Sequence, residues 1–249
     1  MSNLWEDIRF LYRAWRYQWK VESAEIRHVK QRVQPGQTVV DIGGHKGAFT
    51  YWLRRRVGPM GRVLVFEPQP ELADYLRRRV ARFGYSNVTV IEAALSDASG
   101  EATLYRARNE TSPGATLEER SATAGNAFQV TVDTLDRALA RHGIDQVDFI
   151  KCDAEGHELN IFRGATKTLA TGSPELLFEC EQRHLGQRSI QEVFDYLSQQ
   201  DFEGRFFHDG QLKTMPTDST DVPDGVYNFV YGRSQASQNA NQTGHPQAA

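Results

Sequence analysis

A glycine-rich turn that follows an acid is the part of the sequence best suited to bind a ligand. In the run from Val39 to Gly47, Asp41 ends an apolar stretch, and Gly43 and Gly47 come after it. Glycines let the backbone approach a ligand closely and adopt dihedral angles that other residues avoid. The spacing matches neither of the glycine patterns that cradle a diphosphate. A carboxylate at position 41 would repel a diphosphate and attract the ammonium group of a methionine moiety, directly or through water.

A second acid, Glu67, ends the next apolar stretch, directly before Pro68. An acid at this place can accept hydrogen bonds from both hydroxyls of a ribose, as it does in dinucleotide-binding enzymes. Glu67 alone does not separate a nicotinamide cofactor from other nucleosides. Together with Asp41 and the glycine turn, it favours a nucleoside that carries methionine.

Titratable side chains gather after two further apolar stretches, residues 147–152 and 176–180. Ligands of open α/β sheets bind beyond the carboxyl ends of the strands, so these groups should meet at one edge of the sheet. His157 and His184 are the candidates for a general base, because a histidine takes up a proton near neutral pH. The acids beside them are Asp153, Glu155, Glu158, Glu179 and Glu181.

Other roles stay open for these residues. Asp153 and Glu155 could cap a helix that begins near His157, which would leave the histidines as surface residues. Asp153 or Glu158 could be the base, or no base could be used. The acids could also bind Mg²⁺, but nothing in their spacing requires a metal, and none is predicted. The neighbouring lysines, Lys46 and Lys151, could be solvated charges or could contact an acceptor phosphate.

Short apolar strands that alternate with amphipathic helices must position these side chains. The alternation is the βαβ pattern of a mostly parallel sheet. The predicted core strands are 38–42, 62–66, 88–91, 147–152 and 176–180, with further strands at 101–105 and 128–132. Residues 202–207 and 226–231 follow each other without a helix between them, which predicts an antiparallel closing pair. The long polar connection over residues 107–127 suggests a lid, although disorder would give the same composition.

The N-terminal residues 4–20 have the pattern of an amphipathic helix. One stripe of this helix is apolar and largely aromatic, and a second face is basic: the stripe holds Leu4, Ile8, Leu11, Tyr12, Trp15 and Trp19, and the basic face Arg9, Arg13, Arg16 and Lys20. The helix either packs on its own domain or contacts a membrane surface or a second copy of the chain. The Gln-, Asn- and Ser-rich segment 234–249 predicts a disordered tail.

Composition excludes several classes of protein. The 249 residues include 29 basic and 32 acidic side chains, a net charge of −3, which lacks the basic excess of nucleic-acid-binding proteins. Cys152 and Cys180 both lie in predicted buried strands, so we expect reduced thiols and no disulfide. The sequence shows neither a signal-peptide pattern nor an apolar stretch of about 20 residues that could span a membrane. A cytoplasmic location is therefore expected.

Five stretches in a fixed order give the chain a resemblance to FkbM-type methyltransferases: residues 41–47, 66–68, 93–96, 132–136 and 148–158. The resemblance covers about residues 38–181 and implies a Rossmann-like class I methyltransferase fold, with a mostly parallel seven-stranded sheet, an antiparallel final strand and helices on both faces. It implies S-adenosyl-L-methionine as the cofactor, bound by residues that include Asp41, Gly43, Gly47, Glu67, Ala94 and Asp153. It also implies O-methylation of a hydroxyl on a sugar, glycolipid or other natural product.

The resemblance makes residues 35–233 the methyltransferase domain, preceded by the N-terminal amphipathic helical region 1–34. The family more often has asparagine at the position of His45 and a small residue at that of His157, which leaves the acceptor open. A non-catalytic S-adenosylmethionine-binding regulatory protein is the alternative function. A nicotinamide oxidoreductase is disfavoured, because the chain lacks both Gly-x-Gly-x-x-Gly and Tyr-x-x-x-Lys.

Overall fold

In the described part of the chain, the central sheet of the computed structural model has eight strands in the order β10-β9-β11-β8-β7-β1-β2-β3. Five neighbours, β8, β7, β1, β2 and β3, run parallel, whereas β11 is antiparallel to β8 and β9, and β10 is antiparallel to β9. The strands are β1 (Thr38–Ile42), β2 (Arg62–Phe66), β3 (Val88–Ile91), β7 (Phe149–Cys152), β8 (Glu175–Glu179), β9 (Phe202–His208), β10 (Gln211–Thr214) and β11 (Asn228–Arg233). The predicted Rossmann-like α/β sheet with an antiparallel closing strand is confirmed.

The predicted count of seven strands is wrong by one, because β10 turns back on β9 as an edge strand. Asp209 and Gly210 connect the two strands, and both have positive φ, 52° and 70°. Two such residues form the tight turn that matches the twist of a hairpin. The Asp-Gly pair was therefore an available sequence signal for the eighth strand.

The structure describes residues 2–106, 114–118, 127–186, 188–216 and 221–233. Most of the predicted lid and the whole of the predicted tail lie outside the described residues.

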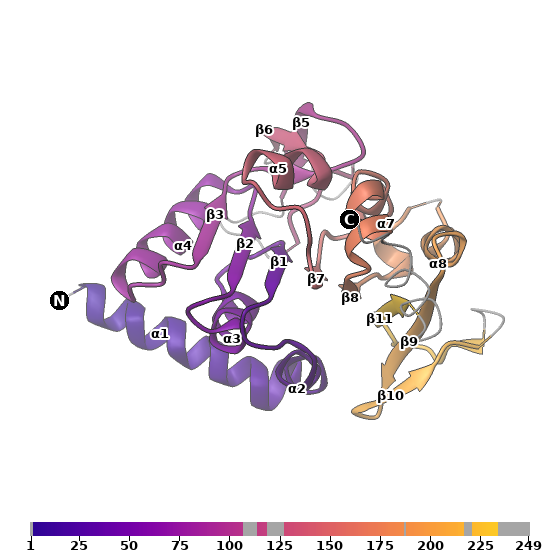
Figure 1. Cartoon of the computed structure of the whole chain (residues 1–249), viewed down its shortest axis with the longest axis horizontal. Coiled ribbons are helices and arrows are strands. Elements are labelled where there is room, and N and C mark those ends of the chain that lie inside the picture. The colour runs from indigo at the N-terminus through magenta and orange to yellow at the C-terminus, as the bar shows by residue number, and fades with distance from the viewer. Residues whose placement is uncertain (1, 107–113, 119–126, 187, 217–220, 234–249) are drawn as a thin grey trace, which may run out of the picture.

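Helices cover both faces of the sheet (Figure 1). The alternation of side chains along each strand creates two apolar clusters: in β1, Val40 and Ile42 face one and Val39 faces the other. The first cluster includes side chains of α5 (Leu135–Arg141), α6 (Glu158–Arg163), α7 (Thr166–Gly172) and α8 (Ile190–Gln199). The second includes side chains of α1 (Ser2–Arg16), α2 (Ser23–Arg32), α3 (Ala48–Val57) and α4 (Pro70–Arg82).

A small second sheet, β4-β6-β5, lies beside the main one. Its strands are β4 (Ala94–Leu95), β5 (Gly100–Tyr105) and β6 (Ala127–Asp133). The segment 114–118 is tied to it, because Tyr105 and Thr116 exchange backbone hydrogen bonds of 2.8 and 2.9 Å. A short 3₁₀ turn, η2 (Gln182–His184), follows β8.

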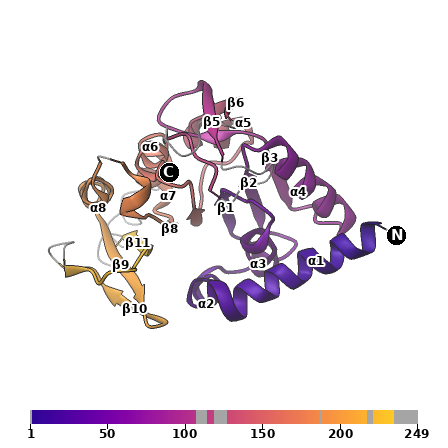
Figure 2. The same ribbon diagram turned by 180° about the vertical axis from the view of Figure 1, so that it is seen from behind.

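The N-terminal helix α1 extends from α4 past α3 toward α2 (Figures 1 and 2). Phe10 and Ala14 on its inner face are buried, and the ring of Phe10 stacks on that of Phe83 at 5.5 Å. The indole nitrogen of Trp52 donates to the carbonyl of Ala14 at 2.9 Å. A π-helical turn, η1 (Tyr17–Val21), continues α1 directly into the start of α2. The first two helices are thus packed on the α/β domain.

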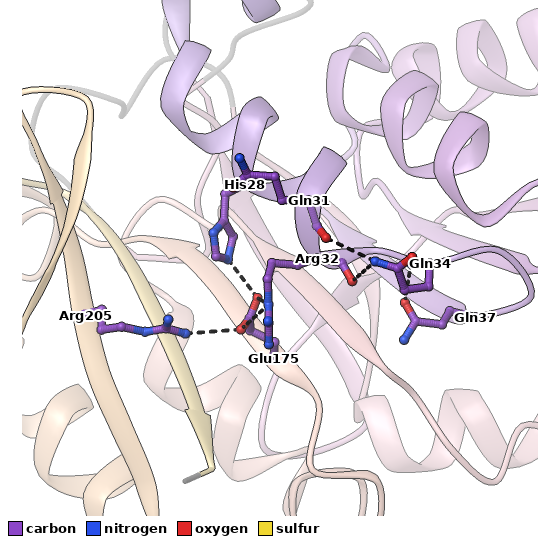
Figure 3. Close-up of polar contacts among 7 residues, drawn as sticks. All are labelled: His28, Gln31, Arg32, Gln34, Gln37, Glu175 and Arg205. Carbon is purple, nitrogen blue, oxygen red and sulfur yellow. Dashed lines mark hydrogen bonds and ion pairs between the residues drawn. The ribbon is translucent and has the colours of Figure 1, made fainter. Parts of the chain in front are cut away.

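Glu175 fastens α2 to the sheet at the amino end of β8 (Figure 3). Its carboxylate lies 2.7 Å from Nε2 of His28, 3.1 Å from Nε of Arg32 and 3.2 Å from Nη2 of Arg205. Burial alone would raise the pKa of Glu175, but the hydrogen bonds from His28 and Arg32 hold it below its ordinary value. The contacts orient the segment that leads from η1 into β1.

Cys152 and Cys180 are free and buried. None of the helices in the described ranges has both the length and the apolar character needed to cross a bilayer.

Candidate functional site

A cavity of about 220 Å³ opens where β1, β2, β7 and β8 end. Because parallel strands end at one edge, it collects side chains that are distant in the sequence. Its lining includes five acids, Glu22, Glu67, Asp153, Glu155 and Glu179. The remaining wall is largely apolar and includes Ala93, Ala94, Leu95, Leu104 and Ile161. Ala94 is thus in the cavity wall.

The turn after β1 forms one side of the cavity. Gly43 has φ of +76°, and a Cβ atom on it would lie 2.0 Å from the carbonyl oxygen of Asp153. The amides of Gly43 and Gly44 both donate to the carbonyl of Phe66, at 2.9 and 3.1 Å. No other residue would fit at Gly43 without moving the chain, so this glycine brings β1 and β7 together at the cavity.

Glu67 lines the cavity and is 2% exposed. Its Oε2 accepts a 2.8 Å hydrogen bond from the amide of His45, and its Oε1 accepts a 2.9 Å bond from the amide of Gln69. Burial raises the pKa of Glu67 to about 7, although these amides favour the charged form. The carboxylate is therefore fixed in orientation at the end of β2.

Asp41 lies behind the turn, in a smaller space that it shares with Arg13, Lys46 and Lys151. Its Oδ2 accepts a 2.5 Å hydrogen bond from the hydroxyl of Thr50 on α3. Burial raises its pKa. Its Oδ1 is buried and has no hydrogen-bond partner among the described residues. That oxygen is available to a ligand group or a water that donates a hydrogen bond.

Gly47 is not among the described residues that line the cavity. It has φ of +80°, and an added Cβ atom would lie 2.8 Å from Phe10 on α1 and 2.9 Å from Leu76 on α4. The structure therefore accounts for this glycine by the packing of α1 and α4 against the start of α3.

A buried lysine lies at the centre of the acids. Alternation along the strands places Asp41, Lys151 and Glu179 on one face of the sheet, since Asp41 pairs with Lys151 in register. The ammonium of Lys151 is 3.0 Å from Oδ2 of Asp153 and 5.0 Å from the ring centre of Phe49. Burial alone would lower the pKa of Lys151, but Asp153 and the other carboxylates hold it above its ordinary value. Lys151 is therefore a fixed positive charge and not a solvated one.

Glu179 and Glu22 complete the charged side of the cavity. Burial, followed by the charge of Asp153, raises the pKa of Glu179 to about 9. Burial raises the pKa of Glu22 to about 7. Tyr17 lines the cavity beside Glu22, and both belong to the connection between α1 and α2. Sequence reasoning missed Tyr17 and Glu22, because no motif marks them and the family resemblance does not reach residues 1–30.

His157 lines the cavity, but both of its ring nitrogens are engaged. Nδ1 lies 2.7 Å from Oε1 of Glu118, and Nε2 lies 2.9 Å from the hydroxyl of Ser96. Glu118 also lies 2.7 Å from a guanidinium nitrogen of Arg188. In this arrangement His157 connects the 114–118 segment to the start of the small sheet.

Glu158 and His184 are not among the described residues that line the cavity. Glu158 is fully buried, and its Oε1 accepts hydrogen bonds from the amides of Ala154 and Gly156 at 3.0 and 3.2 Å. Nδ1 of His184 is 3.0 Å from Oε2 of Glu155. Glu181 is paired with Arg183. Of the predicted candidates for the chemical step, the cavity itself therefore brings together Asp153 and His157.

The donors and acceptors of the site fit S-adenosylmethionine. Burial lowers the pKa of His45 to about 4, and its buried Nε2 has no hydrogen-bond partner among the described residues. Oδ1 of Asp41 is an unpaired acceptor beside the turn for a methionine ammonium, and Nε2 of neutral His45 accepts as well in the tautomer that carries its proton on Nδ1. Glu67 offers the acceptor that a ribose needs, and the apolar wall suits a nucleobase. Within the described ranges, no three His, Cys, Asp or Glu residues are grouped so that they could share a metal ion.

Sequence comparison matches residues 41–203 to the methyltransferase FkbM domain. Methyltransferase sdnD of Sordaria araneosa is 27% identical over 154 residues, which are 51% of this chain and 59% of that protein. A protein-L-isoaspartate O-methyltransferase of Ignicoccus hospitalis is 38% identical over 71 residues, 28% of this chain and 30% of that protein. The chain thus spans less than two thirds of the length of these curated relatives.

Solved structures agree on the fold. Methyltransferase FkbM from Methylobacillus flagellatus KT superposes with a TM-score of 0.54 at 16% identity, covering 91% of this chain and 54% of that one. The O-methyltransferase from Bacillus cereus, in complex with SAH, gives a TM-score of 0.51 at 15% identity, covering 91% and 89%. Since the FkbM domain matches well over half of the sequence, the chain belongs to the FkbM family of S-adenosylmethionine-dependent methyltransferases.

Proposed function

We propose that this protein transfers a methyl group from S-adenosylmethionine to a hydroxyl of a sugar, glycolipid or other natural product. The order of the acids along the edge of the sheet carries the proposal. Glu67 stands at the end of β2, Asp41 lies in β1 just before the glycine turn, and Asp153 and Glu179 stand at the ends of β7 and β8. A nucleoside held at β2 and β1 would present its methionine end toward the last two acids.

In this proposal some residues bind the cofactor and others act on the acceptor hydroxyl. Glu67 would accept the ribose hydroxyls, and Asp41 and His45 would receive the methionine ammonium, directly or through water. When bound, S-adenosylmethionine supplies an electrophilic methyl group on a sulfonium. Asp153 and Glu179 would orient the acceptor hydroxyl in line with that methyl and take up the hydroxyl proton. Residues 35–233 would form the methyltransferase domain, with region 1–34 contributing Tyr17 and Glu22 to the cavity.

Glu179 is the stronger candidate for the base. Without its proton, Glu179 would be a stronger base than an ordinary carboxylate, because its pKa is raised to about 9, and the transfer rate should therefore rise with pH toward about 9 as the carboxyl loses its proton. Lys151 would hold the side chain of Asp153 in place beside it through their 3.0 Å ion pair. His157, His184 and Glu158 would then support the site through the contacts described above and would not touch the reacting oxygen.

Methyl transfer can be tested with S-adenosylmethionine labelled in the methyl group and a panel of monosaccharides and detergent-solubilised glycolipids. We expect label in a product that survives mild alkali, as a methyl ether does and a methyl ester does not. Asp153→Asn and Glu179→Gln should keep S-adenosylhomocysteine binding and lose about 10²- to 10⁴-fold in transfer rate. Saturable binding without transfer to any acceptor would favour the non-catalytic regulatory alternative, and an alkali-labile product would point to a carboxyl acceptor.

A further inference from the structure

The outer face of α1 and η1 exposes an unusual set of large apolar side chains. Trp5, Tyr12 and Trp19 are 65%, 66% and 68% exposed, and Leu4, Ile8 and Trp15 are exposed beside them. These six residues form the α1 outer face. Spacings of three and four residues place Trp5, Ile8, Tyr12, Trp15 and Trp19 on one stripe of the helix.

The fold of the domain uses this face at Trp15, whose ring lies 5.1 Å from that of the buried Trp52, and leaves most of its area exposed. The opposite side of α1 makes the contacts that hold the helix, through Phe10 and Ala14 in the apolar cluster under α3. The acids of α1 also lie toward the domain: Arg79 bridges Glu6 and Asp7, and Arg82 lies 3.1 Å from Asp7. The exposed aromatic residues therefore need an explanation other than the stability of the domain.

Cations line the edge of the α1 outer face. Arg9, Arg16 and Lys20 are exposed, and at helical spacing Arg9 lies next to Trp5, Arg16 next to Tyr12 and Lys20 one turn beyond Arg16. Because both acids of α1 are paired with arginines of α4, these charges are not neutralised within the helix. The whole chain has a net charge of −3, so the basic character belongs to this face and not to the protein in general.

We infer that the α1 outer face docks on the surface of an anionic lipid bilayer. Tryptophan and tyrosine rings favour the headgroup region, where one end is apolar and the other is wet, and neighbouring arginines and lysines bind lipid phosphates. A second copy of the chain fits less well, because a two-fold contact through this face would place the rows of cations near one another. The composition of the face thus selects the lipid surface.

The α1 outer face is connected through η1 to the wall of the cavity, which relates the docking to the proposed reaction. The α1 helix continues without interruption into η1, and Tyr17 and Glu22, at either end of that turn, line the cavity. A bilayer bound to α1 would therefore lie close to the acceptor side of the site. This consequence, which rests on the proposed function, favours an acceptor hydroxyl carried by a membrane lipid.

Flotation of the purified full-length protein with phosphatidylcholine vesicles, with and without phosphatidylglycerol, tests the docking. We expect flotation with the anionic vesicles, reduced by added salt, and a blue shift of tryptophan fluorescence. The double variant Trp5→Ala, Trp19→Ala should lose flotation, whereas Met60→Ala, which removes an 85% exposed side chain elsewhere, should not. The triple variant Arg9→Gln, Arg16→Gln, Lys20→Gln should bind on the order of 100-fold less, while Arg62→Gln, Arg78→Gln, Lys213→Gln matches its charge change and should bind normally.

Binding of S-adenosylhomocysteine to each variant keeps the two proposals apart. The tryptophan and cation variants should bind it as the wild type does, which shows that they are folded and that the cofactor site is independent of docking. Absence of wild-type flotation, or equal flotation of the tryptophan variant, would overturn the docking even if methyl transfer is established. A wild-type dimer that Trp5→Ala, Trp19→Ala converts to monomer, without any vesicle binding, would assign the face to a second copy instead.

Discussion

The amide nitrogen of His45 lies 2.8 Å from Oε2 of Glu67, so one carboxylate joins the turn after β1 to the end of β2 and also lines the cavity. The other oxygen of Glu67 accepts from the amide of Gln69. Two backbone donors therefore hold this side chain in place before any ligand arrives. Such prior organisation lowers the entropy lost on binding.

Replacing Glu67 should weaken binding of the cofactor product. In Glu67→Gln the side-chain nitrogen cannot accept from a backbone amide or a ribose hydroxyl, so we expect S-adenosylhomocysteine to bind about 1.5 to 3 kcal/mol less tightly. Isothermal titration calorimetry measures this loss. Glu101→Gln makes the same chemical change at an exposed site and should leave the affinity unaltered. Equal affinities for Glu67→Gln and wild type would remove Glu67 from the ribose.

Gly47→Ala should destabilise the protein through α1. Both Gly47 and Gly84 have positive φ, +80° and +62°, but a Cβ atom at Gly84 would meet no atom within 4 Å. Gly84→Ala should therefore cost only the backbone strain, about 1 to 2 kcal/mol, whereas Gly47→Ala adds a clash with Phe10 and Leu76 of about 1 to 3 kcal/mol. Urea unfolding compares the two variants. Equal losses of unfolding free energy in the two variants would show that the close contact of Gly47 with Phe10 and Leu76 does not contribute to stability.

The pH dependence of stability should report on Glu179. Because its pKa is raised to about 9 in the folded protein, the native state keeps a proton that the unfolded chain has released. The stability that this proton provides is complete below the unfolded pKa and is lost as the pH rises through about 9. The melting temperature of Glu179→Gln should therefore rise relative to wild type between about pH 5 and pH 9.5.

A series of melting curves over that pH range gives the difference directly. Glu203→Gln, at an exposed position, should give a difference that does not change with pH. A constant difference for Glu179→Gln as well would mean that the carboxyl is not held protonated in the cavity.

Glu158 should prove to be a residue of the fold and not of the chemistry. Its carboxylate accepts the amides of Ala154 and Gly156, so Glu158→Ala leaves two donors of the turn unpaired and should lower the free energy of unfolding by about 2 to 4 kcal/mol. Glu158→Gln keeps a carbonyl oxygen at the same place and should cost less. Chemical denaturation measures both. If Glu158→Gln were as stable as wild type but lost about 10²-fold or more in transfer rate, Glu158 would be the base.

Most of the fold could be predicted from the sequence, because alternating strands and helices leave a strong pattern of apolar residues. The same alternation explains why Asp41 and Lys151 face one side of the sheet. The pattern could not predict which residues that are far apart in the sequence come together in space. Glu22 lines the cavity because α1 and α2 pack over α3. No local sequence pattern predicts that packing. His157 had the right type and place for a base, but its partners, Ser96 and Glu118, lie far away in the sequence and occupy both ring nitrogens.

The number of residues in the π-helical turn η1 determines how α1 is rotated about its axis relative to α2. The amide of Glu22 donates to the carbonyl of Tyr17 at 3.1 Å, a ring that spans five residues where an α turn spans four. A deletion of one residue inside this ring would restore a regular α-helix and rotate α1 by roughly 100° about its axis relative to α2. Relatives that gain or lose a residue here would turn different side chains outward while the glycine turn and Glu67 stay as they are. Insertions and deletions in η1 are thus a route by which evolution could change the surface that this fold engages, together with the position of Tyr17 in the cavity wall.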